Sequence, residues 1–274
     1  MGVLYLIGTP IGNLDDITIR ALHILKSVHL VACEDTRVAR KLLNHYGIQT
    51  KTISCNSHNW VTRINRLSKE LDEHNVAYVS DAGMPSISDP GWEITSELRE
   101  LGYSVEVIPG VSSVTTALTN SGIDASHFSF LGFFPRKQNE ALSILSDYFR
   151  LGTPVVFFES PHRLAKSLQR IHTEFGDIHI TICRELTKFY EEIFSGTIEE
   201  AIDYFSEPRG EFVVVIHPDQ YVNEHQLNVN AQEALSLEIT RMKSEGIQSK
   251  QAIKEISQKL NIRRNVVYKA WINS

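Results

Sequence analysis

The 274-residue sequence contains only three cysteines, and none of them belongs to a CxxC pair. Cys33, Cys55 and Cys183 lie far apart in the chain, which excludes a disulfide scaffold and favours reduced thiols inside strands. The eleven histidines include no HExxH motif and no pairing with cysteine, so we expect no metal site.

The sequence also lacks any apolar run approaching the roughly 18 to 20 residues of a membrane span. Its first residues, MGVLYLIGTPIGN, have no basic region, no long apolar segment and no signal-peptide cleavage site. We therefore expect a cytoplasmic protein. A hydrophobic content of 42% is normal for domains that bury a core, and the length suits two domains of ordinary size with a small third.

Several motifs of nucleotide and acyl chemistry are missing as well. There is no GxxxxGK[ST] P-loop, the first glycine-containing loop is not GxGxxG, and no GxSxG nucleophile elbow occurs. These absences argue against phosphate transfer, a standard dinucleotide site and serine hydrolysis.

Charge is distributed unevenly along the chain. The net charge of −6 argues against a general polyanion binder, but residues 226–274 contain eight Lys or Arg and four Asp or Glu, a net of +4. The preceding residues hold 19 basic and 29 acidic side chains, a net of −10. A basic tail is typical of nucleic-acid contact, although a surface helix with spare lysines looks the same.

The first 120 residues alternate short β-rich runs with helical patterns. We expect strands at residues 3–8, 28–33, 50–55, 75–80 and 103–109, separated by segments such as the helical 16–27 and 61–74. Such alternation predicts a mostly parallel sheet covered on both faces, and hence an α/β domain over residues 1–122.

The pattern changes beyond a cluster of turn residues at 121–126. Closely spaced strands are expected at residues 127–135, 154–160, 178–186, 189–196 and 211–218, with helices near 141–149 and 162–175. This segment predicts a second α/β domain, over residues 123–222, with more antiparallel pairing.

Residues 223–274 predict a small helical segment. Ala252, Ile253, Ile256 and Leu260 mark one helical face, and a short turn precedes a second helical pattern. This is the outline of a helix-turn-helix, in which Arg263, Arg264 and Lys269 would meet a nucleic acid. The alternative is a helical cap with solvated charges.

Three loops follow strands of the first domain and combine glycine with hydroxyls or acids. They are GTPIGNLDD after the first strand, SDAGMPSISDPG after the fourth and PGVSS after the fifth. In open α/β sheets ligands bind beyond the carboxyl ends of the strands. Glycine permits close approach and a carboxylate such as Asp81 can accept hydrogen bonds, so a nucleoside-like ligand is plausible. Alternatively, Asp81 and Asp89 only cap helices.

Seven segments occur in order over most of the chain: GTPIGNLDDIT, CEDTR, SDAGMPSISDPG, IPGVSS, LGFFPRK, ESPHRL and CRELTKFYEE. Together they resemble the tetrapyrrole methylase superfamily of S-adenosylmethionine-dependent enzymes, and within it the RNA 2′-O-methyltransferase branch. The cobalt-corrin and precorrin methylases share the architecture, but typically carry a GDP-type loop in place of SDAGMP and lack a basic helical tail. The resemblance implies transfer of a methyl group to a cytidine 2′-hydroxyl in small-subunit (16S) ribosomal RNA.

The resemblance also implies two α/β domains of the tetrapyrrole methylase type with the donor in the cleft between them. Carried onto matching positions, the donor-binding residues are Pro10, Asp81, Met84, Pro85, Ile87, Ser88, Ser112, Ser113, Phe158, Tyr190, Glu211 and Phe212. The expected partners are small-subunit ribosomal RNA or the assembled subunit, and a second copy of the chain in a homodimer.

Methylation of a hydroxyl requires a proton acceptor, and CEDTR offers Glu34 and Asp35 as candidate bases, with Arg37 suited to grip a phosphate. The other substrate-side candidates are Arg136, Lys137, Glu159, Arg163, Arg184 and Glu185. Alternatively, Glu34 and Arg37 form an ion pair at a helix start, and the residues after Arg136 are a solvated turn.

Two rival functions remain open. A small-molecule methyltransferase acting on a tetrapyrrole would keep the donor loops and bind its substrate without dependence on salt. An RNA-binding protein without enzymatic activity would use the basic tail and would not bind S-adenosylmethionine.

Overall fold

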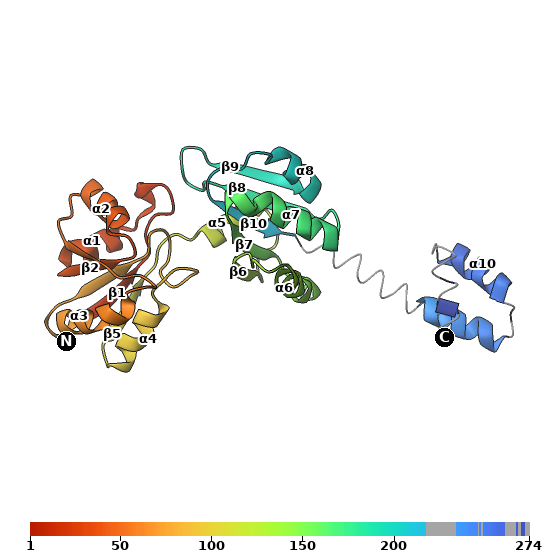
Figure 1. Cartoon of the computed structure of the whole chain (residues 1–274), viewed down its shortest axis with the longest axis horizontal. Coiled ribbons are helices and arrows are strands. Elements are labelled where there is room, and N and C mark those ends of the chain that lie inside the picture. The colour runs from red at the N-terminus through yellow and green to blue at the C-terminus, as the bar shows by residue number, and fades with distance from the viewer. Residues whose placement is uncertain (218–233, 246, 248, 261–266, 268–269, 272–274) are drawn as a thin grey trace. The chain divides into compact units, whose positions relative to one another are not determined.

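The computed structural model describes residues 1–217, 234–245, 247, 249–260, 267, 270 and 271. Residues 1–148 and 153–217 form one compact unit, and the C-terminal helices belong to a second unit. The first unit contains two five-stranded sheets (Figure 1). The predicted α/β class with two α/β parts is therefore confirmed.

The first sheet is parallel throughout. Its strands lie in the order β3-β2-β4-β1-β5, and each neighbouring pair runs in the same direction. The strands are β1 (Val3–Ile7), β2 (Leu30–Cys33), β3 (Lys51–Ser54), β4 (Val76–Val79) and β5 (Ser104–Ile108). All five carboxyl ends therefore meet at one edge of the sheet, where the three glycine-containing loops begin.

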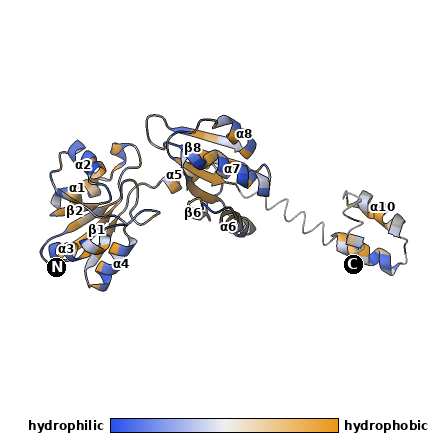
Figure 2. Cartoon of the chain, viewed as in Figure 1, coloured by the Kyte–Doolittle hydropathy of each residue, from blue (hydrophilic) through white to orange (hydrophobic). Residues whose placement is uncertain are grey.

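Helices cover both faces of this sheet because its strands are apolar on both sides. They are α1 (Ile19–Ser27), α2 (Thr36–His45), α3 (Trp60–Glu73) and α4 (Trp92–Glu100), after a 3-10 turn, η1 (Leu14–Asp16). In β2, Val31 packs with α1 and α2, whereas Leu30 packs with α3 and α4. Figure 2 shows the apolar strands inside and polar residues on the outer helix faces.

The second sheet is mixed. Its strands lie in the order β6-β7-β10-β8-β9, with β6 parallel to β7 and the other pairs antiparallel. The strands are β6 (Ser129–Phe133), β7 (Val155–Glu159), β8 (His179–Arg184), β9 (Glu192–Thr197) and β10 (Phe212–Ile216). The helices that alternate with these strands in the chain are α6 (Gln138–Arg150), α7 (Pro161–Phe175) and α8 (Ile198–Tyr204).

The helix α5 (Ser113–Ser121) links the two sheets. It follows β5 of the first sheet, yet Val114, Ala117 and Leu118 pack in one cluster with Val156 and Val215 of the second. The predicted boundary at residue 122 would assign this helix to the first domain, whereas its core contacts are with the second sheet. That boundary stays a prediction.

Two details near β9 differ from the sequence expectation. Residues 189–191 were expected to begin a strand, but they lie in the loop before β9, because the chain turns at Thr187, whose φ is 63°. The helix α8 was not expected. Its signal is a capping box, in which Thr197 and Glu200 each accept a hydrogen bond from the other's backbone.

The C-terminal unit contains a helix over residues 234–244 and α10 (Ser249–Lys259). Leu235, Ile239 and Met242 of the first helix pack with Ala252 and Ile256 of the second in a small core. The predicted second helix of the helix-turn-helix lies largely outside the described residues. Within the described part of the chain, no helix has the length and apolarity that a bilayer crossing requires.

Replacing Leu67 should destabilise the first sheet and its helices. Leu67 lies in α3 and its side chain is fully buried against the first sheet, so Leu67→Ala removes apolar contacts and leaves a cavity. We expect a loss of about 2–5 kcal/mol in the free energy of unfolding, measured by urea denaturation. Val61 of the same helix is 65% exposed, so Val61→Ala should change it by less than about 0.5 kcal/mol. Equal losses in the two variants would contradict this packing.

Candidate functional site

The loops after β1, β4 and β5 are bound to one another through their backbones. Thr9 and Gly83 exchange both of their hydrogen bonds, at 2.9 and 3.0 Å, and the Gly8 amide donates to Ile108. Gly8 and Gly110 approach so closely that a Cβ on Gly8 would lie 2.7 Å from the Gly110 Cα. A side chain at Gly8 would therefore push the first and third loops apart.

The second loop is held in an unusual backbone conformation. Ser86 and Ser88 have φ angles of 73° and 61°, in the left-handed region that residues with a Cβ rarely adopt. Such strain persists only where surrounding contacts hold it, and it is found disproportionately at binding sites. The loop therefore presents its backbone to a ligand in a preset arrangement.

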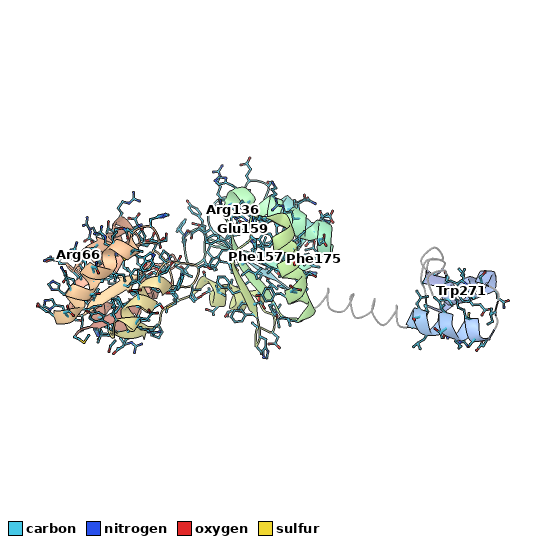
Figure 3. The ribbon with its side chains drawn as sticks, turned by 60° about the horizontal axis from the view of Figure 1, so that its bottom comes forward. Arg66, Arg136, Phe157, Glu159, Phe175 and Trp271 are labelled. Carbon is cyan, nitrogen blue, oxygen red and sulfur yellow. The ribbon has the colours of Figure 1, made fainter. Side chains whose placement is uncertain are left out.

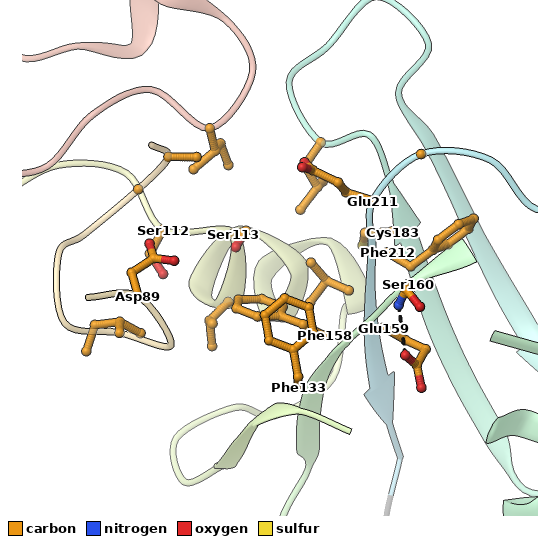
Figure 4. A pocket seen from close by; sticks show the side chains of 18 of the residues that line it. Asp89, Ser112, Ser113, Phe133, Phe158, Glu159, Ser160, Cys183, Glu211 and Phe212 are labelled. Carbon is orange, nitrogen blue, oxygen red and sulfur yellow. Dashed lines mark hydrogen bonds between the residues drawn. The ribbon is translucent and has the colours of Figure 1, made fainter. Parts of the chain in front are cut away.

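A pocket of about 340 Å³ lies against these loops (Figure 4). One wall comes from the first and second loops and the start of α5, and the other comes from strands of the second sheet. Phe133 and Phe158 meet edge to face, with ring centroids 5.5 Å apart, on the wall formed by the second sheet. The volume and apolar lining are those of a site for a small organic molecule.

Seven of the twelve predicted donor-binding residues line this pocket. They are Met84, Ile87, Ser112, Ser113, Phe158, Glu211 and Phe212. The other five are absent from its lining. Pro10 and Asp81 line the adjoining cavity described below, Pro85 is buried, Ser88 faces Gly132 of β6, and Tyr190 is 71% exposed in the loop before β9.

Two further cavities lie on the side of the pocket formed by the first sheet, and they are related to it by shared lining residues. The first, of about 360 Å³, shares Ile11, Ala82 and Glu211 with the pocket and also includes Lys41 and Lys188. The second, of about 410 Å³, shares Asp81 with the first and is lined entirely by polar or acidic residues: Glu34, Asp35, Thr36, Ser54, Asn56, Ser57, His58 and Asp81. We call this second cavity the acidic recess.

The acids of the recess are in different environments. Asp35 caps α2 and forms a bidentate pair with the Arg37 guanidinium, whose hydrogen bonds lower the pKa of Asp35 to about 2. Burial, reinforced by the charge of Asp81, raises the pKa of Glu34. Burial also raises the pKa of Asp81, although its carboxylate accepts a hydrogen bond from the Asp35 amide. Glu34 is therefore a much better proton acceptor than Asp35.

Asp89 lines the pocket and was considered from the sequence only as a helix cap. Burial, together with the nearby charge of Glu34, raises the pKa of Asp89 to about 6. The signal that could have identified Asp89 as a pocket residue is its place in the same loop as Asp81. Sequence reasoning also missed Ile11, Phe133 and Cys183, although each lies in one of the seven matching segments, because their apolar or weakly polar side chains suggest no binding role.

Glu159, which lines the pocket, and the half-buried Arg163 form an ion pair, and their predicted contact with substrate stays a prediction. The Glu159 side chain is fully buried, and its carboxylate accepts hydrogen bonds from the Ser160 amide and the Ser167 hydroxyl. Arg163 pairs with Glu159 and donates to the Phe134 carbonyl. It thereby fixes the segment that leads from Phe133 in the pocket to the exposed Arg136, which Figure 3 shows in the same half as Glu159.

The remaining predicted substrate residues lie in several parts of the chain. Arg184 pairs with Glu192 at 2.7 Å, Glu185 pairs with Lys188 at 3.0 Å, and Lys137 is exposed. Arg37 is paired with Asp35, yet its side chain is 89% exposed beside the acidic recess. Arg263, Arg264 and Lys269 lie outside the described residues.

Comparison with known proteins identifies the family. The profile of the tetrapyrrole (corrin/porphyrin) methylases matches residues 3–202, which include both sheets except for β10. The chain belongs to the tetrapyrrole methylase family. As a member of this family it is a methyltransferase that takes its methyl group from S-adenosylmethionine.

Relatives of one name resemble this tetrapyrrole methylase over nearly its whole length. The protein named Ribosomal RNA small subunit methyltransferase I in Halalkalibacterium halodurans is 38% identical to this chain, and the match covers 98% of this chain and 94% of the relative. The protein of that name in Bacillus subtilis is 39% identical, and the match covers 99% of this chain and 94% of the relative. The relative of that name in Thermotoga maritima is 45% identical and covers 79% of this chain but 98% of itself. The chain is thus a methyltransferase of this group.

Solved structures confirm the fold. A diphthine synthase superimposes with a TM-score of 0.65 at 13% identity, covering 82% of this chain and 95% of that one. A cobalt precorrin-4 methyltransferase superimposes with a TM-score of 0.60 at 19% identity, covering 78% and 94%. At such low identity the likeness shows a common architecture and leaves the methyl acceptor open.

The residues of the pocket fit S-adenosylmethionine. The ligand combines a flat purine, a ribose with two hydroxyls and a positively charged sulfur. The pocket offers aromatic and aliphatic surface at Phe133, Phe158 and Ile87, hydroxyls at Ser112 and Ser113, and the Asp89 carboxylate. Apolar walls with a few placed polar groups suit such a molecule.

Donor affinity should therefore depend on the ionisation of Asp89. Above pH 6 its carboxylate is negative and attracts the sulfonium, whereas below pH 6 it is protonated and the attraction is lost. We expect the Kd measured by calorimetry to rise roughly fivefold between pH 7.5 and 5, since a charge interaction of about 1.4 kcal/mol is lost as Asp89 becomes protonated.

Asp89→Asn should weaken donor binding at pH 7.5 and remove this dependence. Asp203 is an exposed acid of α8, so Asp203→Asn serves as the control and should retain the wild-type pH profile. A wild-type Kd that stays constant from pH 5 to 8 would exclude Asp89 from donor binding.

Proposed function

We propose that this tetrapyrrole methylase transfers a methyl group to the 2′-hydroxyl of a cytidine in small-subunit (16S) ribosomal RNA. Relatives that share 38 to 45% identity with it are named for methylation of that RNA. The structural observation that supports the proposal is the acidic recess, which adjoins the donor pocket through a cavity sharing residues with both. A polar acceptor thus has a route to the donor.

A hydroxyl acceptor requires a base, and we assign that role to Glu34. Bound S-adenosylmethionine would supply the methyl group, whose bond to the positively charged sulfur would break, releasing a neutral thioether, as its bond to the ribose oxygen forms. The Glu34 carboxylate accepts the proton of the 2′-hydroxyl. Its raised pKa makes it more basic than an ordinary glutamate at the moment of transfer.

Asp35 has a positioning role in this scheme. Its carboxylate is bound to Arg37 and to the start of α2, while its amide donates to Asp81 at 3.0 Å. It therefore holds Asp81 and the beginning of α2 at the recess. Orientation of two reactants can account for about 7–11 kcal/mol of a barrier, and Asp35 contributes to it by holding one side of the recess in place.

Cations around the cavities suit a ribose-phosphate chain. Lys41 lines the cavity between the pocket and the recess, and Arg136 and Lys137 are exposed, so these side chains could meet phosphates; Arg37 and Lys188 lie nearby but are paired with acids. The alternative acceptor is a small molecule such as a tetrapyrrole precursor, and salt-independent substrate binding would be its signature.

A ribosomal substrate places the enzyme in the cytoplasm. We retain the homodimer and the contact of the C-terminal helical segment with RNA as parts of the proposal, and the basic composition of residues 226–274 supports the second of these.

The decisive experiment is methyl transfer from labelled S-adenosylmethionine to small ribosomal subunits that lack the modification, with protein-free 16S RNA in parallel. After alkaline hydrolysis a 2′-O-methylated cytidine remains in an uncleaved dinucleotide, whereas a base-methylated nucleotide is released. We expect one alkali-resistant cytidine. Donor binding without transfer to either RNA substrate would redirect the search to small molecules.

The assignment of the base predicts unequal effects of two conservative variants. Glu34→Gln should lower kcat by about 10²- to 10⁴-fold, because the proton acceptor is lost. Asp35→Asn should lower it less than tenfold, because asparagine also caps helices. The donor Kd should stay within twofold in both, measured by calorimetry. Equal turnover in the Glu34→Gln and wild-type enzymes would remove Glu34 from the mechanism.

A further inference from the structure

The loop between β8 and β9 carries two aromatic side chains that point into solvent. Phe189 is 93% exposed and Tyr190 is 71% exposed, and their rings meet edge to face with centroids 5.0 Å apart. Neither residue lines any of the three cavities. Neighbouring aromatic rings exposed to water indicate a surface whose burial against a binding partner would be favourable.

The rest of this loop is tightly held. Lys188 forms ion pairs with Glu185 at 3.0 Å and with Glu211 at 2.8 Å, and the Thr187 amide donates to the Glu191 carboxylate. Glu185 and Thr187 also have left-handed φ angles of 51° and 63°. Because these contacts hold a strained backbone, the two rings are presented in a preset arrangement that costs little to order on binding.

The same loop forms part of the rim of the site. Leu186 lines the donor pocket and Lys188 lines the connecting cavity. The first loop packs against it, with the Asn13 amide donating to the Thr187 hydroxyl at 2.9 Å. A Cβ on Gly12 would lie 2.6 Å from the Leu186 carbonyl oxygen, so glycine is needed for this approach. Phe189 and Tyr190 are thus fixed within one or two residues of both cavities.

Charge and size favour a nucleobase as the occupant. The acids next to the rings have partners within the loop and its surroundings: Glu185 and Glu211 bind Lys188, Glu192 binds Arg184, and Glu191 accepts a hydrogen bond from the Thr187 amide. Two side chains offer far less area than the about 800 Å² per partner of a stable protein interface. They match the faces of one or two bases, which stack on exposed aromatics whatever their sequence.

From these observations we infer that Phe189 and Tyr190 form a stacking platform for unpaired bases next to the methylated nucleotide. Bases inside a duplex are covered by their neighbours, so this platform selects substrate that is single-stranded, or splayed open, at the rim of the site. The inference rests on the proposed ribosomal RNA substrate and specifies the form in which that RNA is accepted.

The test replaces the rings in the full-length enzyme and measures methyl transfer to unmodified small-subunit RNA. Phe189→Ala and Tyr190→Ala should each raise the KM for RNA by about 5- to 100-fold, the range expected for loss of one base stack. The Kd for S-adenosylmethionine should change less than twofold. Tyr190→Phe, which keeps the ring, should retain the wild-type KM, and Val61→Ala controls for the loss of an exposed apolar side chain elsewhere.

Direct binding of a ten-nucleotide oligocytidine, compared with the same strand in a duplex, isolates the preference for unpaired bases. The wild-type enzyme should prefer the single strand, and the Phe189→Ala/Tyr190→Ala enzyme should lose that preference. If the wild-type enzyme methylates RNA, and the double variant keeps both the wild-type KM for RNA and the preference for the single strand, the stacking platform is wrong but the proposed function stands.

The other possible partner of the two rings is a second copy of the chain, and analytical ultracentrifugation tests for it. If the double variant changes from dimer to monomer and retains its preference for the single strand, the rings pack against a second copy and the inference is wrong. If the wild-type enzyme binds the donor but methylates no RNA, the proposed function fails first, and the platform, which depends on it, fails with it.

Discussion

The close contact among three backbone loops is the constraint on which the site depends. Gly8 touches Gly110, and Thr9 pairs with Gly83, so the carboxyl ends of β1, β4 and β5 are joined into one surface. A parallel sheet brings these loops to the same edge, but only residues without side chains let them come this near. The left-handed residues of the second loop are tolerated because that surface is already rigid.

The second constraint is the packing of α5. Its first residues, Ser113 and Val114, line the donor pocket, whereas Ala117 and Leu118 lie in the core of the second sheet. The helix that leaves the first sheet is therefore part of the second, and it holds Phe158 and Phe212 opposite the loops. A family whose members modify different acceptors can keep this arrangement and vary what surrounds it, which fits the shared fold at 13 to 19% identity.

The donor pocket and the acidic recess have opposite character, although cavities connect them. The walls of the pocket are largely apolar, whereas the recess is lined by polar groups and half-buried acids. Burial and like charge raise the pKa of Asp89 in the pocket and of Glu34 in the recess. Under the proposed function, Asp89 would attract the sulfonium of the donor and Glu34 would accept the proton of the acceptor.

How much of this was readable from the sequence differs from one residue to the next. The alternation of strands and helices predicted the α/β class, and the loops rich in glycine, proline and acids after the first, fourth and fifth strands begin at the edge of the sheet where the pocket lies. Met84, Ser112 and Phe158 were predicted as donor-binding residues from a family resemblance, and they line this pocket. Phe133 was not predicted, although it lies in the matching segment LGFFPRK, because an aromatic residue at the end of a strand has no pattern that separates a pocket wall from a core.

The sequence by itself determined which segments become strands and helices and which face of each is apolar, because these follow from side-chain periodicity along a local stretch of chain. The pairs of Asp35 with Arg37 and of Glu159 with Arg163 are also local, two and four residues apart. Only the tertiary structure decided that Glu159 is buried beside the pocket, that Asn13 meets Thr187, and that Phe189 and Tyr190 stand exposed at the rim. These outcomes depend on burial and on contacts between segments up to 174 residues apart, as between Asn13 and Thr187, and no local pattern encodes distances of that kind.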